Sequence, residues 1–334
     1  MDNVIGPVWV IAEQRDCNIR SVSLQLLGRA RQLAGRLGSY TEAVLLGHHM
    51  KDRFEPLMAA GADRIYLADH PMLERYEPEL YLETIVRLAW QHKPEIILLG
   101  STAMGRELAP LLAARLKTGL TAHCINLELN ANNVLEQFIP AYGGLLSIIC
   151  PQKRPQMATV AKGVFPMPAL DGDTDSEVIP VDVPDNISWR MRTLEVVSSV
   201  PDEVPLESAQ RVVAGGAGAG DSDGWKLIAD LSKALNAALG CTRPAVDEGW
   251  APLESMIGQS GRMVKPELYI GVALSGEQQH MVGINGAKLM VAINSDKRSP
   301  VFDQVDIGIV EDFRAFLPIF IDAVNALREK QTSC

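Results

Sequence analysis

The residues with the clearest chemical potential lie in a glycine-rich stretch between Val212 and Asp230. A short apolar run is followed by Gly215–Gly220, where four of six residues are glycine, and then by an amphipathic segment. A strand, a glycine loop and a helix N-terminus in this order present free backbone N–H groups and a positive dipole end, which suit an anion such as a phosphate. The glycines also let a ligand approach the backbone where a Cβ atom would collide.

The spacing of these glycines leaves two interpretations open. The dinucleotide pattern G-x-G-x-x-G fails because Asp221 stands at the position of the third glycine. Only the looser spacing of Gly218, Gly220 and Gly224 remains. The stretch is therefore either a phosphate-binding loop or a strand-to-helix turn that needs glycine for its geometry.

Polar side chains that could bind a ligand follow the glycine loop. They comprise three hydroxyls, four amides, one guanidinium and one imidazole: Thr242, Ser260, Ser275, Gln259, Gln278, Gln279, Asn294, Arg243 and His280. Neither a nucleophile with a base at readable spacing nor a pair of carboxylates is among them. Many hydrogen-bonding groups without an acid–base set indicate a held cofactor rather than a reaction driven by side chains.

The elements that must position these residues form two alternating patterns. In the N-terminal half we expect strands at 8–12, 42–47, 64–68 and 95–100 and helices at 23–37, 54–60, 81–92 and 108–116. This alternation is typical of a doubly wound, mostly parallel sheet. Short apolar runs that suggest an antiparallel extension follow at 126–136, 138–142, 147–150, 157–160 and 177–183.

The C-terminal half predicts a second α/β domain of the flavodoxin or Rossmann kind. We expect strands at 211–214, 268–273, 289–293 and 305–310 and helices at 225–239 and 313–329. Each strand ends in a loop rich in Gly, Ser, Asn or Gln, and such strand ends form the crevice where open α/β sheets bind ligands. The proline-punctuated segment 198–208 predicts a boundary between domains 1–197 and 198–334.

The composition narrows the class of protein. The chain has 334 residues, 47% hydrophobic and 22% charged, with a formal net charge of −10. These values are typical of a soluble globular protein of two domains, and the negative charge argues against a nucleic-acid partner. Neither a signal or transit segment nor an apolar stretch long enough for membrane insertion is present, so we expect a cytoplasmic location.

The cysteines and most histidines give no sign of a metal site. The five cysteines are far apart and never in Cys-x-x-Cys spacing, which argues against disulfides, iron–sulfur clusters and zinc. The histidines other than His280 have no ligand-like spacing with carboxylates. We therefore expect no metal.

Read together, a series of segments resembles the α subunit of electron-transfer flavoproteins. In the C-terminal half they are 213–220, 241–250, 258–261, 265–270, 275–281, 291–294 and 300–302; in the N-terminal half they are 13–16, 105–110, 119–122 and 154–159. The resemblance covers nearly the whole chain in colinear order. It implies FAD held mainly by domain 198–334, with a partner β subunit closing the site and contacting domain 1–197.

The resemblance also implies the residues that would hold FAD. They are Gly216, Thr242, Arg243, Ile257, Gly258, Gln259, Ser260, Ser275, Gly276, Glu277, Gln278, Gln279, His280, Asn294, Asp312 and Phe313. Arg243 would lie beside the flavin ring and stabilise its reduced, negatively charged form. Ser260 would donate to flavin N5 and His280 to the pyrimidine carbonyl, while Asn294, Asp312 and Phe313 would contact the adenosine side. No catalytic side chain is implied.

The sequence departs from the family at three positions in or beside these loops. Ala217 stands where an arginine is usual, so one cation near the cofactor is missing, and we expect weaker FAD binding or a compensating charge from the β subunit. Ser260 replaces the usual threonine and keeps the hydroxyl. Arg262 replaces the usual lysine and keeps the charge.

The resemblance implies a redox carrier that passes electrons between flavoproteins such as acyl-CoA dehydrogenases and an acceptor. Residues 13–16 resemble the branch of the family that bifurcates electrons between NADH, ferredoxin and an acyl-CoA dehydrogenase, with NADH bound through the β subunit. Two other classes stay open. One is a nicotinamide-dependent dehydrogenase that uses the glycine loop, and the other is a nucleotide-binding regulatory module without redox chemistry.

Overall fold

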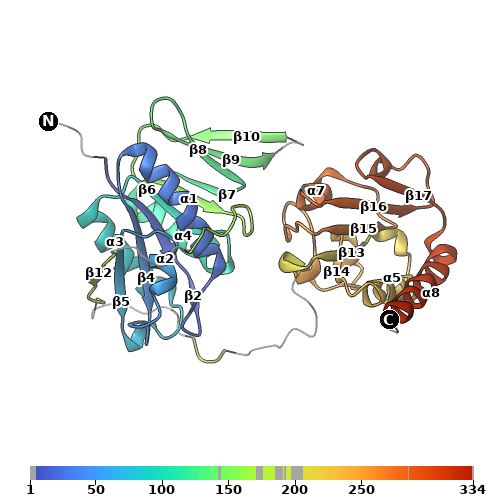
Figure 1. Ribbon diagram of the computed structural model, residues 1–334. Coiled ribbons are helices and arrows are strands. Elements are labelled where there is room, and N and C mark those ends of the chain that lie inside the picture. The colour runs from blue at the N-terminus through green and yellow to red at the C-terminus, as the bar shows by residue number, and fades with distance from the viewer. Residues whose placement is uncertain are drawn as a thin grey trace. The chain divides into compact units, whose positions relative to one another are not determined.

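The computed structural model describes residues 5–141, 144–170, 176–184, 191, 193–196, 206–284 and 286–332. The chain divides into two compact units, Met1–Val197 and Ser198–Cys334 (Figure 1). Tyr142, the last residue of one predicted strand, and residues 198–205 of the predicted boundary segment lie outside the described residues.

The N-terminal unit is built on a parallel sheet with strand order β12-β5-β4-β1-β6-β11-β7. The strands are β1 (Val8–Ala12), β4 (Thr41–Gly47), β5 (Arg64–Asp69), β6 (Ile96–Gly100), β7 (Leu120–Cys124), β11 (Gln156–Val160) and β12 (Glu177–Pro180). The helices are α1 (Ser21–Leu37), α2 (Glu55–Ala59), α3 (Pro78–His92) and α4 (Ala103–Leu116). Val10 packs in the core that includes Leu27 of α1, and Ile11 in the core that includes Ile85 of α3, so both faces of the sheet are covered.

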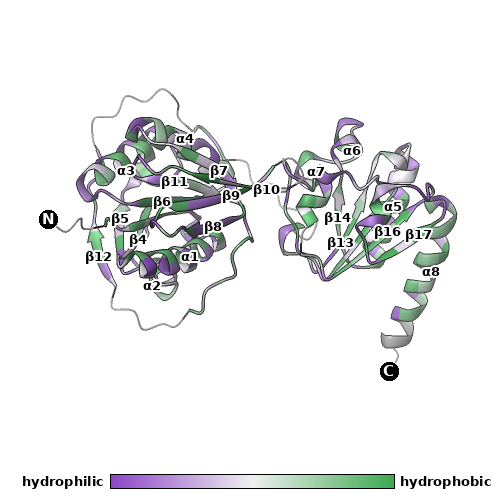
Figure 2. Ribbon diagram, turned by 90° about the horizontal axis from the view of Figure 1, so that it is seen from above, coloured by the Kyte–Doolittle hydropathy of each residue, from purple (hydrophilic) through white to green (hydrophobic). Residues whose placement is uncertain are grey.

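A separate antiparallel sheet, β10-β9-β8, extends this unit. It consists of β8 (Asn126–Leu129), β9 (Leu135–Ala141) and β10 (Gly144–Ile149). Figure 2 shows that β8 and β9 carry more polar residues than the green, apolar β4 and β5.

Two of the strands that we assigned to the antiparallel extension belong instead to the parallel sheet. β11 lies between β6 and β7, and β12 pairs with β5 at the edge. All residues of β11 are buried, which is typical of a strand inside a parallel sheet. A short apolar run indicates a strand but not its direction, so the sequence prediction was wrong on this point.

The C-terminal unit has one parallel sheet with the order β14-β13-β15-β16-β17. Its strands are β13 (Arg211–Gly215), β14 (Ala238–Cys241), β15 (Leu268–Val272), β16 (Leu289–Asn294) and β17 (Ile307–Val310). In chain order this is 2-1-3-4-5, the flavodoxin-like arrangement, so the predicted fold class is confirmed. Helices α5 (Ser222–Ala234) and α8 (Phe313–Thr332) share one core with the sheet.

The predicted helix 225–239 is wrong in its second half. α5 ends at Ala234, Asn236 has a positive φ of 48°, and Ala238–Cys241 then pairs with β13 as strand β14. Alanine and leucine favour helix, so the local sequence 234–239 reads as helical. Asparagine tolerates the left-handed conformation that ends a helix, and pairing with β13 decides the state of the residues that follow.

Short elements complete the fold. They are β2 (Gln14–Arg15), β3 (Asn18–Ile19), η1 (Pro71–Leu73), η2 (Leu206–Ser208), η3 (Ala217–Ala219), α6 (Arg243–Asp247), η4 (Leu253–Ser255), α7 (Gln278–Met281), η5 (Val282–Ile284) and η6 (Pro300–Asp303). Within the described part of the chain, no helix combines the length and the apolar character needed to cross a membrane.

Candidate cofactor-binding site

A pocket of about 790 Å³ lies at the carboxyl ends of the strands of the C-terminal sheet. This size falls in the range of small-molecule sites. β13 has β14 on one side and β15 on the other, so the chain changes direction across the sheet at β13, and ligands bind where such a change occurs. Among the predicted cofactor residues, all but Gly216 and Gln278 line the pocket: Thr242, Arg243, Ile257, Gly258, Gln259, Ser260, Ser275, Gly276, Glu277, Gln279, His280, Asn294, Asp312 and Phe313.

The glycine loop packs tightly on the end of β15. A Cβ atom on Gly216 would lie 2.4 Å from the carbonyl oxygen of Ala273, and one on Gly218 would lie 2.8 Å from the same atom. Ala273 itself has a φ of 52°, an uncommon value for a residue other than glycine and one that is often found at functional sites. Gly216 therefore serves the fit of the loop against β15, whereas Ala217 and Gly218 line the pocket.

Two further loops interlock on the other side of the pocket. The backbone N–H of Gln259 donates to the carbonyl of Gln279 at 2.7 Å. Gly258 has a φ of 142°, and a Cβ atom there would lie 2.4 Å from the same Gln279 oxygen. Residues 257–260 and α7 therefore form one packed unit. Ser260 and Gln259 lie on its exposed side, where a ligand can reach them.

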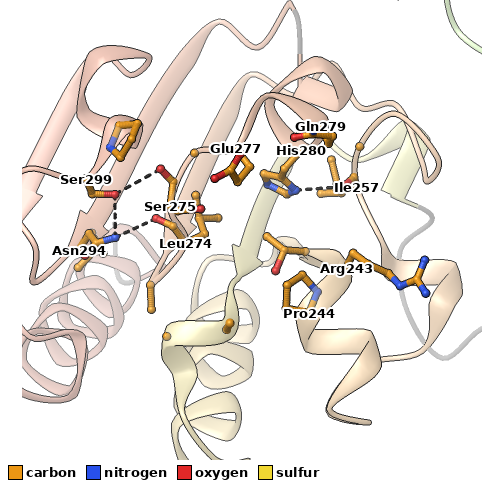
Figure 3. A pocket seen from close by; sticks show the side chains of 18 of the residues that line it. Arg243, Pro244, Ile257, Leu274, Ser275, Glu277, Gln279, His280, Asn294 and Ser299 are labelled. Atoms are coloured by element: carbon orange, nitrogen blue, oxygen red, sulfur yellow. Dashed lines mark hydrogen bonds between the residues drawn. The ribbon is translucent and has the colours of Figure 1, made fainter. Parts of the chain in front are cut away.

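His280 is buried in this unit, with 5% of its surface exposed. Nε2 lies 2.7 Å from Tyr269 Oη. Nδ1 lies 3.0 Å from the carbonyl oxygen of Ile257 (Figure 3). Burial lowers the pKa of His280 to about 4, so the imidazole is neutral at pH 7. Both ring nitrogens are bonded within the protein, which differs from the expected donor role toward a flavin carbonyl.

The end of β16 supports the loop that follows β15. The Asn294 side-chain amide donates to the Leu274 carbonyl at 2.9 Å and to Ser299 Oγ at 3.3 Å, and Ser299 Oγ donates to the Ser275 carbonyl at 3.3 Å (Figure 3). The Gln304 side chain donates to the Gly276 carbonyl at 2.7 Å. These bonds hold the segment that begins at Leu274, so its backbone is presented to the pocket in one conformation.

Two cations lie at the rim of the pocket. Arg243 Nε is 2.8 Å from Asp247 Oδ1 in α6, and Figure 3 shows its guanidinium turned away from Leu274 and Ser275. Arg314 Nη2 donates to the Ala219 carbonyl at 2.9 Å and to Asp221 Oδ1 at 2.8 Å. Bonds from the Gly224 N–H and from Arg314 hold the pKa of Asp221 below its usual value.

Thr242 supplies a direct sign that the pocket takes a polar ligand. Its Oγ1 is buried and has no hydrogen-bond partner among the described residues. A buried hydroxyl without a partner is costly, and native proteins rarely leave one unless a water or ligand completes it. With the glycine loop, the exposed hydroxyl of Ser260 and the fixed backbone of Ser275, the donor set fits a nucleotide cofactor with many polar atoms.

Sequence reasoning missed several lining residues: Gly218, Pro244, Met256, Ala273, Leu274, Ile293, Ser295, Asp296, Ser299, Pro300 and Arg314. Gly218 lay inside the glycine loop, and Arg314 directly follows Phe313, so their neighbours were a usable signal. Ala273, Leu274 and Ile293 are apolar residues at strand ends, and nothing in their type separates them from the core.

Comparison with known proteins agrees with this arrangement. The profile of the electron transfer flavoprotein domain matches residues 8–186, and that of the electron transfer flavoprotein FAD-binding domain matches residues 205–285. The electron transfer flavoprotein subunit alpha of Thermoanaerobacterium thermosaccharolyticum is 40% identical over 96% of this chain and 98% of its own length.

Two other relatives are similar over almost the full chain. Protein FixB of Clostridium saccharobutylicum is 39% identical over 94% of this chain and 95% of its own length. The acryloyl-CoA reductase electron transfer subunit beta of Anaerotignum propionicum is 32% identical over 97% of this chain and 96% of its own length.

Proposed function

The chain belongs to the electron transfer flavoprotein family as an α subunit with an FAD-binding domain, and from this premise we propose that FAD lies in the pocket at the carboxyl ends of β13–β17. The observation that carries the proposal is the buried, unpartnered Thr242 hydroxyl in a pocket at the switch point of a flavodoxin-like sheet. FAD supplies the redox chemistry when it is bound, and the protein binds, orients and tunes it.

Different residues of the pocket would bind different parts of FAD. The unit formed by residues 257–260 and α7 would hold the flavin ring, with the Ser260 hydroxyl as a donor to it. The adenosine side would meet Asn294, Asp312 and Phe313. Near the glycine loop the negative charge of the cofactor would meet Arg314, which is paired with Asp221, the N-cap residue of α5.

Arg243 would stabilise negative charge on the reduced ring. Its side chain is 65% exposed in the ion pair with Asp247. Exposed pairs of this spacing contribute only about 0.3–0.5 kcal/mol, so Arg243 can turn toward the ring at little cost.

The electron-transfer role of the family requires partners, and we propose three. A β subunit would contact the N-terminal unit and close the FAD site. The exposed apolar residues Leu145, Leu146 and Ile149 on β10 support such a contact. A flavoprotein of the acyl-CoA dehydrogenase type would exchange electrons with FAD, in keeping with the acryloyl-CoA reductase relative. A separate acceptor would complete the transfer.

Flavin content distinguishes two forms of this function. A simple carrier would hold about one FAD per heterodimer. A bifurcating complex would hold about two, because a second flavin in the β subunit would receive electrons from NADH, and ferredoxin would be a further acceptor. Residues 13–16 favour the bifurcating form.

The test is to co-express the chain with an electron transfer flavoprotein β subunit and to measure the absorption spectrum and the FAD content. The proposal predicts flavin bands and bleaching by an acyl-CoA dehydrogenase with its substrate. A heterodimer without flavin that binds NAD and transfers hydride would instead support the nicotinamide-dependent dehydrogenase. A heterodimer that binds a nucleotide without redox activity would support the regulatory module.

A further inference from the structure

Tyr269 and His280 form a buried pair directly behind the FAD pocket. Tyr269, the second residue of β15, has no exposed surface, and its hydroxyl lies 2.7 Å from His280 Nε2. His280 lines the pocket, whereas Tyr269 does not. The resemblance assigns no role to Tyr269.

The hydrogen-bond partners of His280 determine where its proton lies. The Ile257 carbonyl oxygen, 3.0 Å from Nδ1, can only accept, so Nδ1 must carry the hydrogen. The ring is neutral at pH 7, because burial lowers its pKa. Nε2 therefore has a free lone pair, and the Tyr269 hydroxyl must donate to it. Burial also raises the pKa of Tyr269, which keeps this hydroxyl protonated.

These two hydrogen bonds connect three structural elements. They run from the core strand β15 through α7 to the Ile257 backbone, which starts the loop that carries Gln259 and Ser260. The Gln259–Gln279 backbone bond and the close packing of Gly258 depend on the same alignment of loop and helix. Rotation or a change of tautomer at His280 would break the link to Ile257 and release the loop.

We propose that Tyr269 is a positioning residue of the FAD site, whose hydroxyl holds His280 as the Nδ1–H tautomer and thereby fixes residues 257–260 against α7. His280 acts on the cofactor through this clamp and not by donating a ring N–H to it. The inference rests on the proposed binding of FAD in this pocket.

A histidine NMR experiment tests the tautomer without any mutation. The chain, co-expressed with its β subunit and labelled with ¹⁵N-histidine, should show His280 neutral at pH 7 with its proton on Nδ1; Tyr269→Phe and His280→Asn spectra assign the signal. A His280 that carries its proton on Nε2, or on both nitrogens, would overturn the proposal.

A double-mutant cycle tests the effect on the cofactor. Tyr269→Phe removes one hydroxyl, and we expect the FAD dissociation constant to rise about tenfold, as for the loss of one buried hydrogen bond. In His280→Asn the side-chain amide can still donate to the Ile257 carbonyl. In this background Tyr269→Phe should change the dissociation constant less than about twofold, because Tyr269 has no imidazole to hold.

The N-terminal unit offers a matched control. Tyr66 is 2% exposed and its hydroxyl lies 3.0 Å from Nδ1 of the partly buried His92, so Tyr66→Phe also removes a Tyr–His hydrogen bond. This variant should leave FAD binding unchanged. Equal tenfold effects of Tyr269→Phe in both backgrounds would show a general structural role and overturn the clamp, as would no effect in either.

The failure of this inference differs from the failure of the proposed function. If the wild-type heterodimer binds no FAD in this pocket, both fail. If it binds FAD, but Tyr269→Phe matches the wild type and the Tyr66→Phe control in FAD affinity, only the clamp is wrong.

Discussion

At Thr242, replacing the hydroxyl should increase the stability of the cofactor-free protein but weaken FAD binding. Its Oγ1 is buried without a partner among the described residues, so Thr242→Val removes an unsatisfied hydroxyl. We expect the cofactor-free protein to gain up to about 1 kcal/mol in free energy of unfolding, and FAD affinity to fall about tenfold. Urea unfolding and FAD fluorescence titration measure the two quantities.

Thr41 provides the control for this prediction. Its Oγ1 is also buried without a partner in the described residues, but it lies in β4 of the N-terminal unit. Thr41→Val should stabilise the protein in the same way and leave FAD affinity unchanged. An unchanged affinity in Thr242→Val would mean that this hydroxyl does not meet the cofactor.

His280 makes the stability of the C-terminal unit depend on pH. Its pKa is about 4 in the folded protein and 6.5 in the unfolded chain, so between these values only the unfolded chain binds the proton. The contribution of His280 to the free energy of unfolding is therefore fully present above pH 6.5. It decreases by about 3 kcal/mol in total as the pH falls toward 4.

The difference in unfolding free energy between the wild type and His280→Asn isolates this contribution from the many carboxylates. It should shrink by about 3 kcal/mol between pH 7 and pH 4 in urea unfolding. A difference that stays constant over this range would contradict the buried, neutral histidine.

Residue types predicted most of the residues that line the pocket but not their hydrogen-bond partners. The hydroxyls, three of the four amides, Arg243 and His280 line the pocket, as expected for polar residues at strand ends that converge on one crevice. The bonds from His280 to Tyr269 and Ile257 were not predictable, because β15, α7 and the loop meet only in the tertiary structure. Arg314 was missed because it is the second residue of a helix that was assigned by its apolar face.

At the scale of elements, the loops around the pocket contain glycines whose replacement by another residue should destabilise the fold. Gly276 has a φ of 80°, and a Cβ atom would lie 2.5 Å from Val301 Cα in η6. Gly249 has a φ of 75° but no atom within 4 Å of the added Cβ. We expect Gly249→Ala to cost about 1 kcal/mol from backbone strain alone, and Gly276→Ala to cost about 3 kcal/mol because η6 must also move.

The free energy of unfolding in urea measures both costs. Equal losses for the two variants would show that the contact with Val301 does not constrain the loop. An unstable Gly276→Ala that retains wild-type FAD affinity would show that the loop fold and the cofactor are not coupled.

The glycine loop carries Ala217 at the position where the resemblance implies an arginine. Ala217 is exposed and lines the pocket, so a long side chain fits there. Ala217→Arg should tighten FAD binding roughly fivefold, raise the flavin potential and make the affinity more sensitive to salt. Equilibrium titration and spectroelectrochemistry measure these changes.

Ala114→Arg adds the same charge to an exposed position of α4 in the N-terminal unit and serves as the control. It should leave the affinity and the potential unchanged. If Ala217→Arg behaves like this control, the missing arginine does not weaken FAD binding in this protein.

The elements themselves were predictable wherever one pattern dominated. Alternating apolar strands and amphipathic helices specified the two α/β sheets because their periods differ. The sequence did not predict the direction of β11 and β12 or the strand conformation of Ala238–Cys241. Pairing with strands that are distant in sequence determines both.

At the scale of the whole molecule, each unit has its own sheet and its own cores. The pocket proposed for FAD is lined only by residues of the C-terminal unit, within the described part of the chain. The exposed apolar strand β10 leaves the N-terminal unit a surface for the proposed β subunit. The proposed FAD pocket and the proposed contact surface on β10 thus lie in different units, so mutations can test them separately.

The most direct test is a density map of the heterodimer purified with its flavin. We expect FAD in the pocket of the C-terminal unit, with the flavin ring against residues 257–260 and α7 and the adenosine side toward Asn294 and Phe313. A map with this pocket empty or obstructed, or with flavin bound only in the β subunit, would contradict it.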